Sequence, residues 1–263
     1  MQSNKLEVIY LDTPEHKTET LEWNDYRIGV FIMKNKEKST YNEDSLFLYG
    51  DDENLVFGVS DGAGGHPRGK DAAQITATEV IDFYKKKNIN SIQEIEVIES
   101  INDKILELKA GARSTITMAT IHQDNLRSFS VGDSEVIYWN GHGSELYSNI
   151  PQSEVGYRIE AGLLSQDESL DDPERYSVNN LLGDTSIRIE VASKMKIKKG
   201  HTILIGSDGL FDNLSHEELT ELVGKGSFDK SFEELSSICI EQNIETWKKD
   251  DDISFVLVRK IKA

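Results

Sequence analysis

Short apolar runs rich in β-branched and aromatic residues alternate with polar turn residues along the chain, and this pattern predicts strands. Many of the runs are short, and several follow one another at the spacing of β-hairpins. The predicted strands are residues 28–33, 45–49, 55–60, 114–121, 126–131, 135–139, 187–192, 202–207 and 253–259.

Two pairs of helices are predicted between the strands, because apolar residues there recur at helical spacing. The four helical stretches are residues 69–87, 91–110, 215–224 and 231–247. Ser215 and Glu218 give the third stretch a capping signal. In the fourth, one face could be shared by Phe232, Leu235, Ile238 and Trp247.

Runs of strands broken by helix pairs predict an α+β domain in which helices cover antiparallel sheets. The chain has 263 residues, of which 37% are hydrophobic, and it lacks repeats and Pro-rich or Gly/Ser-rich linkers. It is therefore expected to form a single domain, residues 1–263. Residues 141–183 are polar, contain Pro151 and Pro173, and are predicted to form a flap-like surface excursion.

Acidic residues outnumber basic ones by 47 to 29, which gives a net charge of −18. This charge should repel nucleic acids and anionic lipid surfaces, so neither is expected as a partner. No apolar run approaches the roughly 18 residues that span a bilayer, and the first residues lack the apolar core of a signal peptide. Cys239 is the one cysteine and is expected to be a buried structural thiol. These features predict a cytoplasmic protein and leave its oligomeric state open.

Two apolar runs far apart in the sequence end in the same tripeptide, Ser60-Asp61-Gly62 and Ser207-Asp208-Gly209. Asp-Gly after a strand is also a common turn signal, and for either occurrence alone a turn is the better interpretation. Here, however, the first pair continues into a glycine-rich stretch and a predicted helix, and the second also leads toward a helix. An aspartate at such a strand end is held rigidly, and the glycine beside it admits a ligand.

Three more acidic groups lie next to predicted strands: Asp44, Asp133 and the run Asp250-Asp251-Asp252. Because no paired His or Cys ligands accompany them, these groups indicate oxygen-only coordination of Mg²⁺ or Mn²⁺. Two such ions about 3.5–4 Å apart would turn a shared water into hydroxide and stabilise the leaving oxygen of a phosphoryl group. The pattern therefore predicts metal-assisted hydrolysis.

The acidic motifs resemble, in order and spacing, those of the type 2C metal-dependent protein serine/threonine phosphatases, the PPM family, and look most like its bacterial branch. The resemblance covers about residues 40–259. It rests on Asn42-Glu43-Asp44, Asp61-Gly62-Ala63-Gly64-Gly65-His66, Gly132-Asp133-Ser134, Ser207-Asp208-Gly209-Leu210-Phe211-Asp212 and Asp251-Asp252-Ile253-Ser254. It implies a β-sandwich of two packed antiparallel sheets flanked by helix pairs, a four-layer αββα fold with a binuclear metal centre at one edge.

Carried over to this sequence, the resemblance implies a set of metal ligands that comprises Asp44, Asp61, Gly62, Asp133, Asp208 and Asp251. Asp61 would bridge both metals and Gly62 would offer its carbonyl, while Asp208 and Asp251 would complete the coordination; these three aspartates are the implied catalytic residues. Asp44 would act through metal-bound water, and Asp133 would help to hold a weaker third ion. The implied reaction is in-line attack of a metal-bridging hydroxide on phosphoserine or phosphothreonine in a phosphorylated protein substrate.

The sequence departs from the family pattern where an arginine usually binds the substrate phosphate, because residues 34–41 contain no arginine. Lys36 or Lys38 could supply positive charge, and Lys38 is the candidate phosphate-binding residue, although an ammonium lacks the bidentate geometry of a guanidinium. In addition, Asp252 stands where the family usually has an asparagine, directly after the last metal-binding aspartate. Asp251 and Asp252 are thus alternative ligands, and the spacing favours Asp251.

Two other functions stay open at this point. The missing arginine also fits a non-catalytic or impaired relative, a regulatory module that binds a partner without hydrolysing it. A small-molecule phosphohydrolase is the other alternative, because nothing in the sequence identifies the leaving group. A binding module has no physical need to keep several mutually repelling carboxylates together, and this favours an enzyme.

Overall fold

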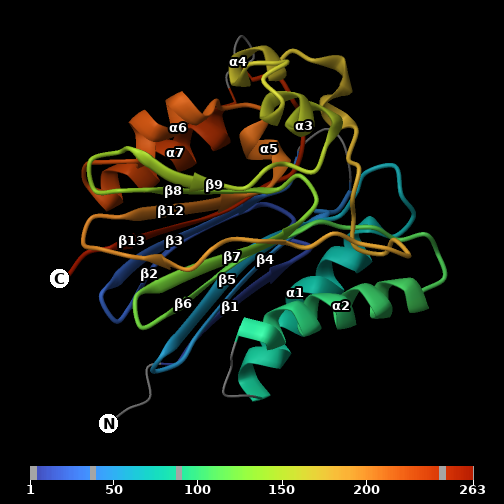
Figure 1. The fold of residues 1–263 in the computed structure, drawn as a ribbon, viewed down its shortest axis with the longest axis horizontal. Helices are drawn as coiled ribbons and strands as arrows, with labels where there is room; N and C mark the ends of the chain where they lie inside the picture. The colour runs from blue at the N-terminus through green and yellow to red at the C-terminus, as the bar shows by residue number, and fades with distance from the viewer. Residues whose placement is uncertain (1–4, 36–39, 87–90, 243–246, 263) are drawn as a thin grey trace.

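The computed structural model describes residues 5–35, 40–86, 91–242 and 247–262. Two antiparallel sheets pack face to face, and helices cover both of their outer faces (Figure 1). The predicted α+β sandwich with four αββα layers is therefore confirmed. In the described parts of the chain, no helix combines the length and the apolarity needed to cross a bilayer.

The two sheets are antiparallel throughout, and their strand orders bring distant parts of the sequence together. The first sheet has the order β1-β4-β5-β6-β7-β10, and β11 also pairs with β7. Its strands are β1 (Leu6–Leu11), β4 (Asp44–Gly50), β5 (Asn54–Asp61), β6 (Ile116–His122), β7 (Asn125–Val131), β10 (Glu190–Val191) and β11 (Met195–Lys196). The second sheet has the order β2-β3-β13-β12-β8-β9. Its strands are β2 (His16–Trp23), β3 (Tyr26–Met33), β8 (Glu135–Trp139), β9 (Glu145–Ser148), β12 (Thr202–Gly206) and β13 (Ile253–Lys260).

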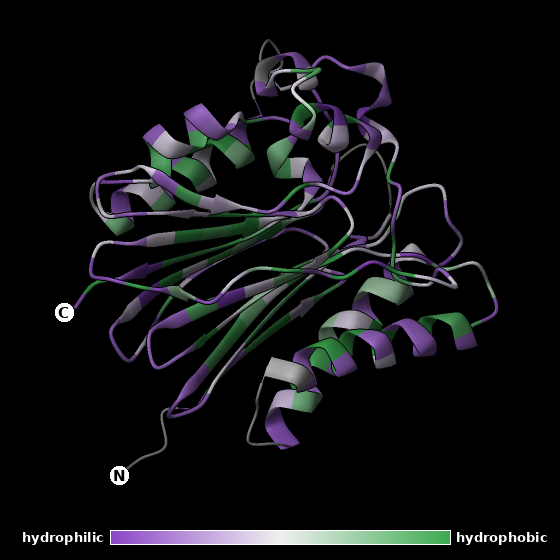
Figure 2. Ribbon diagram, viewed as in Figure 1, coloured by the Kyte–Doolittle hydropathy of each residue, from purple (hydrophilic) through white to green (hydrophobic). Residues whose placement is uncertain are grey.

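Three apolar cores separate the four layers, and Figure 2 shows the hydrophobic stripes of strands and helices that form them. One core lies between the sheets, and a second lies between the first sheet and the helices α1 (Gly69–Lys86) and α2 (Ser91–Glu107). The third lies between the second sheet and the helices α5 (Asp208–Phe211), α6 (His216–Val223) and α7 (Phe228–Glu241). Cys239 is buried in this third core, as expected, and burial raises the pKa of its thiol.

Several element boundaries differ from those predicted. The sequence pattern missed β1, β2, β9 and the two-residue β11. Five successive residues of β2 are exposed, so this edge strand lacks the alternation that identifies strands. The helix predicted over 231–247 is instead α7, which ends at Glu241 because Gln242 takes a left-handed conformation with φ 42°. Residues 243–246 lie outside the described chain, and Trp247 packs against the third core from beyond the helix.

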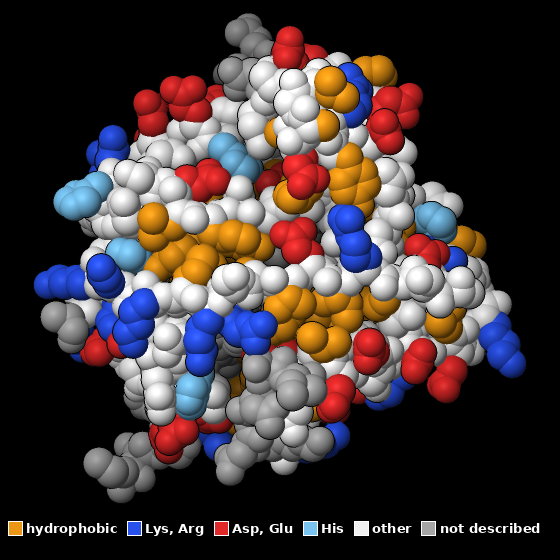
Figure 3. Space-filling view, in the orientation of Figure 1, with side chains coloured by type: hydrophobic (Ala, Val, Ile, Leu, Met, Phe, Trp, Pro, Cys, Tyr) orange, Lys and Arg blue, Asp and Glu red, His pale blue; other side chains and the backbone are white. Residues whose placement is uncertain are grey.

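The stretch predicted as a flap-like excursion, residues 141–183, lies mostly outside the two sheets (Figure 1). It contains β9, the short helices α3 (Glu154–Glu160) and α4 (Gln166–Ser169), and the 3₁₀ helix η1 (Pro173–Tyr176). Its last part returns to the body of the protein, where Leu182 is buried and exchanges backbone hydrogen bonds with Ser114. In Figure 3, acidic side chains lie around this excursion, and others lie along the lower right of the same face.

Candidate metal centre

The strand register of the first sheet places Asp44 directly opposite Asp61. Asp44 begins β4 and Asp61 ends β5, and the two are paired residues of the antiparallel ladder. The Asp61 backbone is fixed by Thr115, whose Oγ1 accepts from the Asp61 N–H at 3.0 Å and whose N–H donates to the Asp61 carbonyl at 2.8 Å. Thr115 Oγ1 also lies 2.8 Å from Ser134 Oγ, which connects this strand end to the turn that carries Asp133.

The second sheet brings Asp208 and Asp251 to the same edge of the sandwich. Asp208 begins α5 directly after β12, and Asp251 precedes β13, which pairs with β12. Ser207 connects the two sheets, because its hydroxyl donates to Asp44 Oδ2 at 2.7 Å and also accepts from the Ser254 N–H at 3.0 Å. Aspartates from four strand ends and one turn therefore meet at one place.

A cleft of about 480 Å³ opens over these side chains. Asp61, Asp133, Asp208 and Asp251 line it, whereas Asp44 is buried behind them. The glycine-rich loop at residues 62–66 and part of the excursion, residues 176–178 and Leu181, also line the cleft. The structure thus brings the predicted carboxylates together around a space open to solvent.

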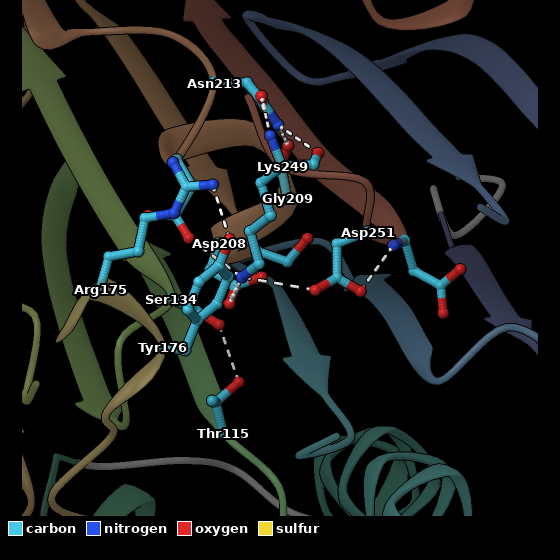
Figure 4. Close-up of polar contacts among 12 residues, drawn as sticks. Thr115, Ser134, Arg175, Tyr176, Asp208, Gly209, Asn213, Lys249 and Asp251 are labelled. Carbon is cyan, nitrogen blue, oxygen red and sulfur yellow. Dashed lines mark hydrogen bonds and ion pairs between the residues drawn. The ribbon is translucent and has the colours of Figure 1, made fainter. Parts of the chain in front are cut away.

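Lys249 lies among these carboxylates, and sequence reasoning gave it no role. Its ammonium pairs with Asp208 Oδ2, lies 3.0 Å from Asp212 Oδ2 and lies 3.4 Å from Asp251 Oδ2 (Figure 4). Only 4% of the Lys249 side chain is exposed. Burial favours the neutral amine, but the neighbouring carboxylates outweigh it and raise the pKa of Lys249 above its ordinary value. From sequence, a lysine beside a run of aspartates is typical of a solvated surface charge.

Asn213 holds the segment that carries Lys249 against α5 (Figure 4). Its Oδ1 accepts from the N–H groups of Lys248 and Lys249 at 2.7 and 2.8 Å. Its Nδ2 donates to the carbonyls of Gly209 and Lys249, each at 2.9 Å. The Asn213 side chain is buried, and three of its four hydrogen bonds are buried as well, so they fix where Lys249 and Asp251 lie relative to Asp208.

The carboxylates destabilise one another's charges. Burial, together with the charges of Asp208 and Asp44, raises the pKa of Asp61 well above its ordinary value. Burial and the charge of Asp252 do the same to Asp44, against hydrogen bonds that favour its charged form. Burial and Asp208 raise the pKa of Asp133 to about 8. Such a group of buried acids is stabilised by cations placed among them.

The two alternative ligands, Asp251 and Asp252, occupy different environments. Asp252 is buried, and its oxygens accept from the N–H groups of Asn35 and Glu43, each at 2.7 Å. Asp251 lines the cleft beside Lys249 and Asp208. The geometry therefore favours Asp251 as the ligand. Lys36 and Lys38 lie outside the described residues.

The donor chemistry of the site fits a hard divalent cation, because the convergent groups are carboxylates. Within the described residues, however, no three acidic, His or Cys side chains form a group that could hold a metal ion as they stand. An ammonium lies between Asp208, Asp212 and Asp251 instead. The chemistry of the carboxylates therefore suits Mg²⁺ or Mn²⁺, and the cation that the structure places among them is the Lys249 ammonium.

Comparison with solved structures identifies the fold. A structure described as a bacterial serine phosphatase aligns with a TM-score of 0.77 at 18% identity, over 90% of this chain and 98% of that one. The catalytic domain of the serine threonine protein phosphatase PstP, in a complex with 2 manganese ions, aligns with a TM-score of 0.73 at 17% identity, over 90% and 99%. The fold is one that serine/threonine phosphatases adopt.

Sequence comparison identifies the family. The sequence model of the family described as Protein phosphatase 2C matches residues 34–250. A putative protein phosphatase 2C-type from Streptococcus pyogenes serotype M6 is 24% identical over 212 residues, which are 76% of this chain and 85% of that protein. This chain belongs to the protein phosphatase 2C family of serine/threonine phosphatases.

Proposed function

We propose that this protein hydrolyses phosphoserine and phosphothreonine in a protein substrate, in a reaction that requires two Mn²⁺ or Mg²⁺ ions and admits a weaker third. The observation that carries the proposal is the convergence of Asp61, Asp208 and Asp251 from both sheets on one cleft, in a chain of this family. When bound, the ions would supply positive charge and activate water for attack on the phosphate.

The positions of the side chains support distinct roles toward the ions. We assign Asp61, Asp208 and Asp251, which line the cleft, as direct ligands and the catalytic set, with the Gly62 carbonyl beside Asp61. Gly62 has no room for a side chain, because a Cβ there would lie 2.5 Å from the Gly69 carbonyl carbon. Asp133 lines the cleft near Asp208, in keeping with a third ion.

Asp44 is held behind the cleft by the hydroxyl of Ser207, and this suits contact with an ion through water. Lys38 remains our candidate for binding the substrate phosphate. The cleft is large enough for a phosphorylated side chain, and the excursion that forms one wall would contact the protein around it.

The test is hydrolysis of a phosphothreonine peptide with and without MnCl₂. We expect activity that depends on Mn²⁺ and that falls more than about 100-fold in Asp208→Asn, since even groups that only support metal ligands are worth about 10–100-fold. Asp229→Asn is the matched control, because Asp229 is an exposed aspartate that pairs with Arg27. Peptide hydrolysis that is equally fast in EDTA would contradict the proposal.

One observation favours a second function, that of a regulatory module that binds without hydrolysing. Lys249 neutralises part of the acidic cluster in the structure, as it would in a protein that works without metal. Mn²⁺ binding or partner binding with no turnover of any phosphate ester would establish this alternative. Hydrolysis of small phosphate esters far better than of phosphopeptides would instead identify a small-molecule phosphohydrolase.

A further inference from the structure

We propose that Lys249 is a built-in counter-ion that occupies the cation position of the metal-free protein, and that divalent metal ions bind by displacing its ammonium. This inference rests on the proposed metal-dependent function. Lys249 would compete with the metal ion for the carboxylates. The affinity for the ion would then depend on a side chain that is not itself a ligand.

The position of the Lys249 ammonium supports the proposal directly. It contacts carboxylates of Asp208 and Asp212, at the two ends of α5, and of Asp251 on the segment before β13. Asp208 and Asp251 are also two of the residues assigned as metal ligands. An ammonium and a divalent ion repel each other strongly at such short range and cannot share the same oxygens. Binding of the metal there requires the ammonium to leave.

The structure also provides a way for Lys249 to move. Asn213 fixes the Lys249 backbone through both its N–H and its carbonyl. The movement can therefore be confined to the side chain of Lys249. The four-carbon stem of a lysine has rotatable bonds that can redirect the ammonium. Lys249 lines the open cleft, and its ammonium lies 5.4 Å from the centroid of the exposed Tyr176 ring. The displaced ammonium would therefore turn toward the cleft and its solvent.

The neighbouring basic side chains bind other partners and do not lie among the carboxylates that contact Lys249. Lys248 pairs with Asp171 on the excursion at 2.8 Å. Arg175 directs its guanidinium to the carbonyls of Leu170 and Lys248. Lys248 is consequently a matched control, since it is the adjacent lysine, is also ion-paired, and lies outside the lining of the cleft.

The first experiment measures Mn²⁺ binding by calorimetry to the wild type, Lys249→Met and Lys248→Met. We expect Lys249→Met to bind Mn²⁺ at least about tenfold more tightly than the wild type, because one competing cation is gone. Lys248→Met should match the wild type. Equal or weaker binding by Lys249→Met, with its fold intact by circular dichroism, would overturn the proposal.

The second experiment uses the wild type alone and thus does not depend on how a variant folds. The protein is acylated with an N-hydroxysuccinimide ester in EDTA and in saturating MnCl₂, and modification is read by mass spectrometry. We expect Lys249 to become severalfold more reactive when Mn²⁺ binds, while Lys248 stays constant. A Lys249 that is equally protected with Mn²⁺ bound would show that the ammonium is not displaced.

The two experiments separate this inference from the proposed function. Displacement of Lys249 by Mn²⁺ without hydrolysis of any phosphopeptide would support the inference and overturn only the proposed activity. Hydrolysis with Lys249 still protected would support the activity and overturn only the inference. If neither the wild type nor Lys249→Met binds Mn²⁺, both are wrong.

Discussion

Replacement of Asn213 by alanine should destabilise the protein strongly and loosen the site. The change removes four hydrogen bonds, three buried and one partly buried, and leaves the N–H groups of Lys248 and Lys249 without their acceptor. At about 1 kcal/mol net for each bond, the expected loss in the free energy of unfolding is about 4 kcal/mol. For a domain of this size, that loss corresponds to a fall in Tm of about 10 °C.

The assay is thermal and urea unfolding of the metal-free protein in EDTA, followed by circular dichroism. Asn140→Ala is the matched control, since the Asn140 side chain also accepts two backbone N–H bonds, from His142 and Ser144, but in an exposed turn. It should cost less than about 1 kcal/mol, as surface substitutions usually do. We also expect Asn213→Ala to bind Mn²⁺ more weakly, because Asp251 loses its fixed position relative to Asp208. A loss as small as that of the control would refute the reasoning.

Two further changes test other parts of the fold. His216 donates hydrogen bonds to Glu135 and Glu145, and these bonds, together with the charges of the two carboxylates, outweigh burial and raise the pKa of His216 from 6.5 to about 10. Because the folded-state pKa is the higher one, this stabilisation is complete below pH 6.5 and is lost as the pH rises toward 10. Urea unfolding should show a loss on the order of 5 kcal/mol over this range, which His216→Asn abolishes. Gly58→Ala would place a Cβ 2.3 Å from the Thr117 carbonyl oxygen, so a loss of about 1–3 kcal/mol is expected. Gly64→Ala is the control, because a Cβ at Gly64 would have no atom within 4 Å, and this variant should unfold at nearly the wild-type urea concentration. Equal midpoints for the two variants would contradict the close packing around Gly58.

Local patterns in the sequence were sufficient to predict the class of fold and to select the aspartates that the structure brings together. Strands such as β5 and β12 are largely apolar runs, and each leads into the tripeptide Ser-Asp-Gly, so their ends could be located without knowing which strands pair. The helices α1 and α6 likewise have clear periodicity and boundaries. The predicted end of the last helix was wrong because a single left-handed residue, Gln242, ends α7. Local backbone geometry of this kind leaves a weak signal in the sequence.

The tertiary structure decided which side chains share one environment. Antiparallel register sets Asp44 opposite Asp61, and pairing of β12 with β13 brings Asp208 near Asp251. The same packing turns Asp252 toward backbone N–H groups.

Lys249, which the sequence presents as one more charged residue before a strand, becomes a buried cation among carboxylates. Charges interact through space, over distances that cannot be read from the sequence. The sequence by itself therefore determined which acidic groups this protein has at its strand ends, and only the folded chain decided which of them meet and which cation lies between them.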